Sequence, residues 1–67
     1  MTKERLMEVN NFYYEVKEMK DVEVIRAYNV NLEALNNKEL NEDDIAVGQM
    51  KQLILIHSLK NRGIFGK

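Results

Sequence analysis

Few side chains of this chain could carry out covalent or acid–base catalysis. Its 67 residues include one histidine, one serine, one threonine and no cysteine. His57 and Ser58 are adjacent in the sequence, and adjacent residues of a helix point about 100° apart. They therefore cannot form the hydrogen-bonded pair of base and nucleophile that covalent catalysis requires. We interpret His57 as a structural residue and predict that the protein is not an enzyme.

The three acids at positions 42–44 have the residue type of a calcium site but not its spacing. In a calcium-binding loop that began at Asn41, the fifth position would need an oxygen ligand and the sixth a glycine. Those positions hold Ile45 and Ala46. No cysteine could bind a metal as a thiolate, and the three glycines are isolated rather than grouped in a phosphate-binding loop. The sequence predicts no metal, no cofactor and no small-molecule substrate.

The acids are better explained as the first turn of a helix over residues 42–62. Asn41 can cap its N-terminus, where carboxylates also suit the positive end of the helix dipole. At the other end two cations precede Gly63, and glycine readily adopts the left-handed conformation that closes a helix. With Gly63 just past the end, Ile64 and Leu59 become the apolar pair that accompanies such a cap. The apolar run at 53–56 could also be a buried strand, but matching caps at both ends favour the helix.

Two further helices are predicted upstream, over residues 3–20 and 22–36. Thr2 is a suitable N-cap for the first, whose apolar residues recur at helical spacing. The second is rich in valine, isoleucine and tyrosine, and residues 28–32 alternate between apolar and polar as a strand does. We predict a helix because the helical spacing continues to Leu35, and we keep a strand over 22–32 as the alternative. Residues 65–67 are predicted to be a loose tail.

The helix over 42–62 has apolar residues on two sides, more than a helix on the surface of a small monomer needs. One stripe is predicted to pack against the two upstream helices. It consists of Ala46, Val47, Met50, Leu53 and Ile54. The other stripe is predicted to form a homodimer interface. It consists of Ile45, Leu55, Ile56 and Leu59, extended by Ile64 and Phe65.

The size of the chain also indicates association. A domain of 67 residues buries only a small core, and small proteins usually add disulfides, a metal or a partner. The lack of cysteine excludes disulfides, and the absence of proline together with 45% hydrophobic residues favours a globular helical fold. The sequence therefore predicts an all-α, single-domain, three-helix bundle, with the C-terminal helix central and a second copy completing the bundle.

The sequence contains no signal for a membrane or for secretion. No apolar run approaches the ~20 residues of a membrane span. The N-terminus carries acids early and lacks the apolar core of a signal peptide. We expect a cytoplasmic protein that does not bind membranes.

Charge is unevenly distributed along the chain. Residues 1–44 hold all eleven acids against six lysines and arginines, a net charge of −5, and residues 45–67 carry +4. Attraction within the chain explains much of this pattern, but Lys51, Lys60 and Arg62 are also candidate contacts to an anionic partner. A small dimeric nucleic-acid-binding protein is therefore the alternative function. Against it stand the overall charge of −1 and Asp44, which occupies a position that a helix-turn-helix needs to be small and apolar.

The main functional prediction is a non-enzymatic protein–protein interaction or regulatory module that binds itself and another, unidentified protein. Most apolar residues of the helix over 3–20 form one stripe for the core. Met7 and Tyr14 lie on the side away from that stripe, two turns apart. They are the candidate patch for the unidentified partner.

Overall fold

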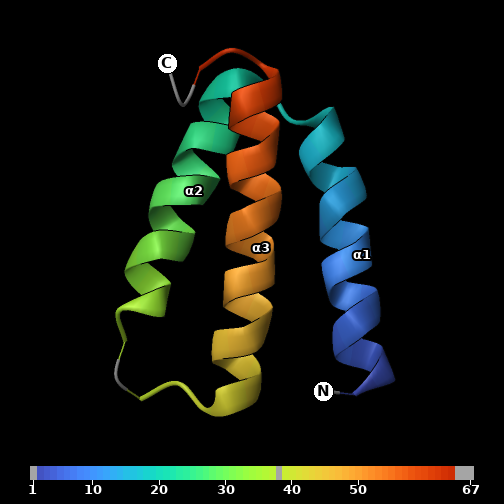
Figure 1. Cartoon of the computed structure of the whole chain (residues 1–67), viewed down its shortest axis with the longest axis vertical. Coiled ribbons are helices and arrows are strands. Elements are labelled where there is room, and N and C mark those ends of the chain that lie inside the picture. Colours follow the sequence, from blue (N-terminus) through green and yellow to red (C-terminus); the bar gives the residue numbers. More distant parts are fainter. Residues whose placement is uncertain (1, 38, 65–67) are drawn as a thin grey trace.

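The structure, a computed structural model, describes residues 2–37 and 39–64 and consists there of three helices (Figure 1). They are α1 (Lys3–Glu18), α2 (Asp21–Leu35) and α3 (Glu42–Asn61). The described residues contain no strand, so the predicted all-α, three-helix fold is confirmed and the strand alternative over 22–32 is wrong. Predicted and observed helix ends differ by at most two residues. The predicted tail at 65–67 lies outside the described residues.

Both N-caps predicted from the sequence are present. The Thr2 hydroxyl accepts a hydrogen bond from the Arg5 N–H at 3.2 Å, and the Asn41 side chain accepts one from the Asp44 N–H at 2.8 Å. Each cap satisfies a backbone donor that has no partner within the first turn of its helix. The caps therefore explain why α1 and α3 begin where they do.

The C-terminus of α3 ends in the predicted glycine cap. Gly63 has a φ of 75°, the left-handed conformation that glycine adopts without steric cost. The Ile64 N–H donates to the Leu59 carbonyl at 3.0 Å, and the Gly63 N–H donates to the Lys60 carbonyl at 3.0 Å. These two bonds define a Schellman motif, which satisfies carbonyls that the helix itself leaves unpaired.

The three helices form a flat arrangement with α3 in the middle (Figure 1). α1 and α2 each pack along α3, whereas the contact between α1 and α2 is slight. α1 runs in the same direction as α3, and α2 runs in the opposite direction. The molecule measures 32 × 24 × 17 Å along its principal axes. α3 is therefore central, as predicted, and a flat molecule has two broad sides.

The core between the helices is small. Among the described residues, five hydrophobic side chains are buried, and four of them form one cluster. The cluster consists of Val16 from α1, Val24 from α2, and Leu55 and Leu59 from α3. Val47 is buried separately.

The predicted division of α3 into an inner and an outer stripe is right for Val47 and Ile54, which are buried or packed against the core, and wrong for four other residues. Leu55 and Leu59, predicted at a homodimer interface, are 0% and 2% exposed and lie in the core of their own chain. Met50 and Leu53, predicted to pack against α1 and α2, are 38% and 66% exposed. The side of α3 that holds Leu55 is the side that the other two helices cover.

The reason lies in the polar residues that flank Leu55 on α3. Lys51 extends toward α1, where its Nζ donates to Glu8 at 2.7 Å. Gln52 extends toward α2, where its Oε1 accepts a hydrogen bond from Asn31 at 2.8 Å. These two bonds offset part of the cost of burying the polar groups, although Gln52 Nε2 is buried without a hydrogen-bond partner among the described residues. They make it possible for α1 and α2 to cover this side of α3. The partners lie 43 and 21 residues away in the sequence, which is why the periodicity of α3 alone does not reveal them.

Gly48 lets α2 approach α3 closely. A Cβ atom at this position would lie 2.5 Å from Leu35 Cδ2, well inside normal carbon–carbon contact. Asn31 also donates to the Gly48 carbonyl at 2.9 Å. Glycine within a helix is less favourable than alanine by about 1 kcal/mol. Packing between the two helices accounts for its presence in α3.

Candidate functional site

One broad side of the molecule carries exposed apolar residues from all three helices. We call this side the apolar face. It is defined by six residues with exposed fractions between 38% and 66%. They are Leu6 and Tyr13 from α1, Ile25 and Leu32 from α2, and Met50 and Leu53 from α3.

Helix geometry and shared surface hollows show that these residues face the same way. Tyr13 lines a hollow together with Ile54 and His57 of α3, and Leu6 lies two turns before Tyr13 on the same side of α1. On the other flank, Leu35 lines a hollow with Gln49 and Leu53. Leu32 and Ile25 lie one and three turns before Leu35 on α2. The three helices therefore contribute to one continuous surface, with Leu53 near its centre.

Acidic side chains of α1 point away from the apolar face. Glu4, Glu8 and Glu15 line a hollow on the other side of the helix with Phe12 and Lys51. Polar residues that border the apolar face include Lys17, Gln49, His57 and Lys60. Glu42, five turns before Lys60 at the start of α3, lies on the same side of the helix.

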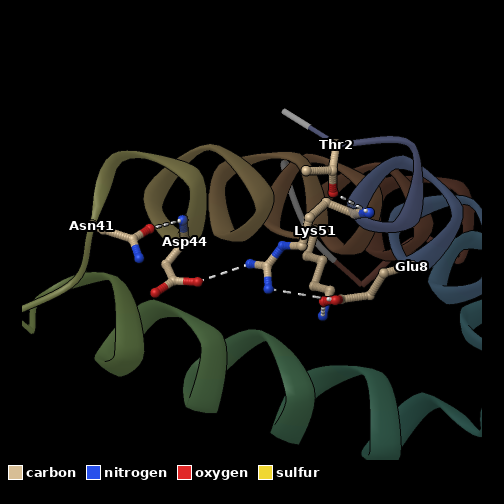
Figure 2. Close-up of polar contacts among 6 residues, drawn as sticks. Thr2, Glu8, Asn41, Asp44 and Lys51 are labelled. Atoms are coloured by element: carbon tan, nitrogen blue, oxygen red, sulfur yellow. Dashed lines mark hydrogen bonds and ion pairs between the residues drawn. The ribbon is translucent and has the colours of Figure 1, made fainter.

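The opposite broad side, which we call the polar face, holds the ion pairs that join α1 to α3. Arg5 pairs with Asp44 at 2.9 Å, and Lys51 pairs with Glu8 at 2.7 Å. Figure 2 shows Glu8 and Lys51 side by side, with Asp44 and its Asn41 cap further toward the start of α3. The hydrogen bond and charge of Lys51 lower the pKa of the Glu8 carboxyl below 4.5.

The Glu8–Lys51 pair predicts a specific acid sensitivity. The unfolded chain takes up the Glu8 proton at higher pH than the folded chain, because the folded-state pKa is the lower one. The pair's contribution to stability is therefore present above pH 4.5 and is lost as the pH falls through the folded-state pKa. We expect urea unfolding of Glu8→Gln to show a shallower loss of stability below pH 4.5 than unfolding of the unmodified chain.

Glu15→Gln is the matched control for this prediction. It removes a carboxylate from α1 two turns away and leaves the Glu8–Lys51 pair in place. Its stability should fall with acid as steeply as that of the unmodified chain. Equal slopes for Glu8→Gln and the unmodified chain would contradict the assignment.

The predicted dimer residues do not lie together on one surface. Leu55 and Leu59 are buried in the core, and Ile56 is half-buried. Ile45 and Ile64, near opposite ends of α3, are each 38% exposed. Phe65 lies outside the described residues. A dimer interface built on Leu55 and Leu59 is therefore incompatible with this fold.

The predicted partner patch on α1 is exposed. Met7 is 56% and Tyr14 is 57% exposed, on the side of α1 opposite Val16 and the core. The Tyr14 ring meets the Tyr13 ring edge to face, with centroids 5.4 Å apart. Lys17 Nζ lies 4.5 Å from the Tyr13 centroid and 5.5 Å from the Tyr14 centroid. This cluster joins the patch to the edge of the apolar face.

Two of the three predicted contacts to an anionic partner bind groups of their own chain. Lys51 pairs with Glu8, and its Nζ lies 5.2 Å from the Phe12 centroid. Arg62 donates to Asp21 at 2.7 Å and to the carbonyls of Val16 and Met19. Lys60 is exposed on α3. The described residues therefore offer little concentrated positive charge for a phosphate backbone.

His57 is exposed beside the apolar face. Residues 2–37 and 39–64 hold no group of three or more histidine, aspartate or glutamate side chains placed to bind a metal. In the same residues, no helix has both the length and the apolar character needed to cross a membrane.

Sequence reasoning missed the apolar face because it assigned whole apolar stripes to the core. On α1, Val16 packs in the core, whereas Leu6 and Tyr13, at the edge of the same stripe, are 51% and 39% exposed. On α2, Val24 is fully buried and Ile25 is 39% exposed. The width of these apolar stripes could have predicted the exposed face, because each stripe is wider than the strip of helix surface that one neighbouring helix covers.

Comparisons of the chain with protein-family models, with curated proteins and with solved structures find no match.

Proposed function

We propose that the protein is a non-enzymatic protein–protein interaction module that works by burying its apolar face against an apolar protein surface. One observation carries this proposal. Six large apolar side chains from three helices are exposed on one side of the molecule, and Glu4, Glu8 and Glu15 of α1 line a hollow on the other side of that helix. Contiguous apolar surface of this kind marks interaction sites in soluble proteins.

The dimensions of the molecule support the proposal. The broad side measures 32 × 24 Å, an area of about 770 Å² in projection. A partner that covered it would bury an area close to the ~800 Å² that each protein contributes to a standard interface. With five buried hydrophobic side chains among the described residues, the core is small, and added burial would stabilise the fold.

The composition of the apolar face also suits an interface. Its centre holds Met50 and Leu53, and Tyr13 stands at the α1 side. Methionine and aromatic residues are enriched in interface centres, while charged residues are depleted there. The charges nearest to it, on Lys17, Glu42 and Lys60, lie at its border. The module would act by occupying a surface of its partner, and the nucleic-acid alternative has weaker support because Lys51 and Arg62 bind within the chain.

Two methionines provide a test that needs no knowledge of the partner. Met50 lies on the apolar face at 38% exposure, and Met7 lies on the outer side of α1 at 56% exposure. Peroxide converts an accessible methionine to its sulfoxide, which mass spectrometry locates. We expect Met50 to be oxidised severalfold more slowly in cells that express the protein than in a dilute purified sample. The rate at Met7 should stay the same in both.

The ratio of the two rates decides the outcome. If the ratio of the Met50 oxidation rate to the Met7 oxidation rate is the same in cells as in the dilute purified sample, no partner covers the apolar face. That result would overturn the proposal. Selective protection of Met7 would overturn it as well, because the covered surface would then be the outer side of α1.

A further inference from the structure

We infer that the apolar face is covered by a second copy of this chain, with the two α3 helices packed antiparallel around a two-fold axis. This inference rests on the proposed function and names its partner. The spacing, charge and size of the residues along the uncovered side of α3 support it.

The uncovered side of α3 carries a seam with coiled-coil spacing. Its positions are separated alternately by four and three residues, the spacing at which two helices pack side by side. All six are exposed or half-buried. We call them the α3 seam. They are Glu42, Ala46, Gln49, Leu53, Ile56 and Lys60.

Charge at the two ends of the seam favours an antiparallel pair. Glu42 and Lys60 are eighteen residues apart, which is five helical turns, so they lie on the same side of α3. An antiparallel second copy brings its Lys60 opposite Glu42, and its Glu42 opposite Lys60. A parallel copy would instead place glutamate against glutamate and lysine against lysine.

The inner positions of the seam match under the same rotation. A two-fold axis level with position 51 pairs Ala46 with Ile56 of the second copy, and Gln49 with Leu53 of the second copy. The first pair sets a small residue against a large one, which is how facing helices interdigitate. Two-fold interfaces require a surface that complements itself in this way, because each contact occurs twice.

The flank of α1 is consistent with this axis. The bond between Lys51 and Glu8 shows that residue 8 of α1 lies level with position 51 of α3. Leu6 and Tyr13 therefore stand on either side of the axis. The rotation brings Leu6 to the level of Asn10 of the second copy, within about one turn of its Tyr13, so apolar residues of α1 border the seam on both copies.

The chain contains no cysteine, so single cysteines can report the orientation. Two variants, Glu42→Cys and Lys60→Cys, would be mixed in equal amounts and oxidised. An antiparallel pair places the two thiols opposite each other and keeps one glutamate–lysine contact at the other end. We expect the mixed disulfide between the two variants to predominate. Val30→Cys, at a residue of α2 that is 61% exposed and far from the seam, is the control and should give little disulfide.

Light scattering over a hundredfold range of concentration would accompany the disulfide experiment on the unmodified chain. We expect the unmodified chain to be a dimer. Lys60→Glu places glutamate opposite Glu42 of the second copy and should raise the dissociation constant roughly tenfold. The double variant Glu42→Lys, Lys60→Glu restores opposite charges and should restore the dissociation constant. Predominant disulfides between identical variants would overturn the antiparallel orientation. Cross-linking through Val30→Cys as efficient as through the seam would overturn the choice of surface. A monomer at every concentration, with Met50 still protected in cells, would reject the second copy and leave the proposed function standing.

Discussion

Leu55→Ala is expected to lower the free energy of unfolding by about 3 kcal/mol, which is the cost of emptying a fully packed leucine site. Leu55 is 0% exposed and belongs to the core cluster with Val16, Val24 and Leu59. Domains of this size have little stability to lose, since one core of this size supplies about 3–5 kcal/mol. A large part of the population should therefore unfold at room temperature. Urea titration followed by circular dichroism measures the change.

Leu53→Ala is the matched control, two positions away on the same helix. Leu53 is 66% exposed, so its removal from the monomer should change the free energy of unfolding by less than about 0.5 kcal/mol. The comparison has to be made at a concentration low enough for the monomer to prevail, because Leu53 belongs to the proposed interface. If Leu55→Ala stayed folded and Leu53→Ala unfolded, the division of α3 expected from its sequence would be right and the observed packing wrong.

Arg62→Met is expected to cost about 2 kcal/mol through the loss of charge-assisted hydrogen bonds. Arg62 reaches from the end of α3 to both other helices. Its guanidinium donates to Asp21 at the start of α2 and to the Val16 and Met19 carbonyls at the end of α1. It also donates to Ser58 at 2.9 Å. Removing it should loosen the end of the bundle where α1 connects to α2, which hydrogen exchange at residues 16–24 would locate.

Arg26→Met makes the same chemical change at an exposed position of α2 and should alter stability by less than about 0.5 kcal/mol. Arg62→Lys keeps the charge but loses the planar fork of donors, and we expect it to recover only a minor part of the loss. Equal unfolding curves for Arg62→Met and Arg26→Met would show that the Arg62 contacts contribute nothing to stability.

The contacts of Arg62 and Lys51 also account for part of the uneven charge of the chain. Each of these two cations meets an acid from the N-terminal part, Asp21 for Arg62 and Glu8 for Lys51. Arg5 and Asp44 form a further pair between α1 and α3. Opposite charges on segments far apart in sequence thus help to align the helices, although each exposed pair contributes little alone.

Local sequence was sufficient to determine the helices and their ends. The caps at Thr2 and Asn41 and the left-handed Gly63 depend on residues within five positions of one another. Such bonds form wherever the local chain adopts the helix, so their partners can be read from spacing alone. The same holds for α2, where helical spacing outweighed its many strand-favouring residues.

The assignment of faces was decided only by the tertiary structure. α3 has apolar residues around most of its circumference, so its sequence does not say which side faces the other helices. That choice depends on Glu8 and Asn31, which bond Lys51 Nζ and Gln52 Oε1 from distant parts of the chain and make it possible to bury the side that holds Leu55. Gly48, where Leu35 packs closely, favours the same side. Leu53, on the opposite side of α3, is left exposed as a consequence. A buried polar group needs a hydrogen-bond partner close to it in space, and the periodicity of a single helix contains no information about that partner.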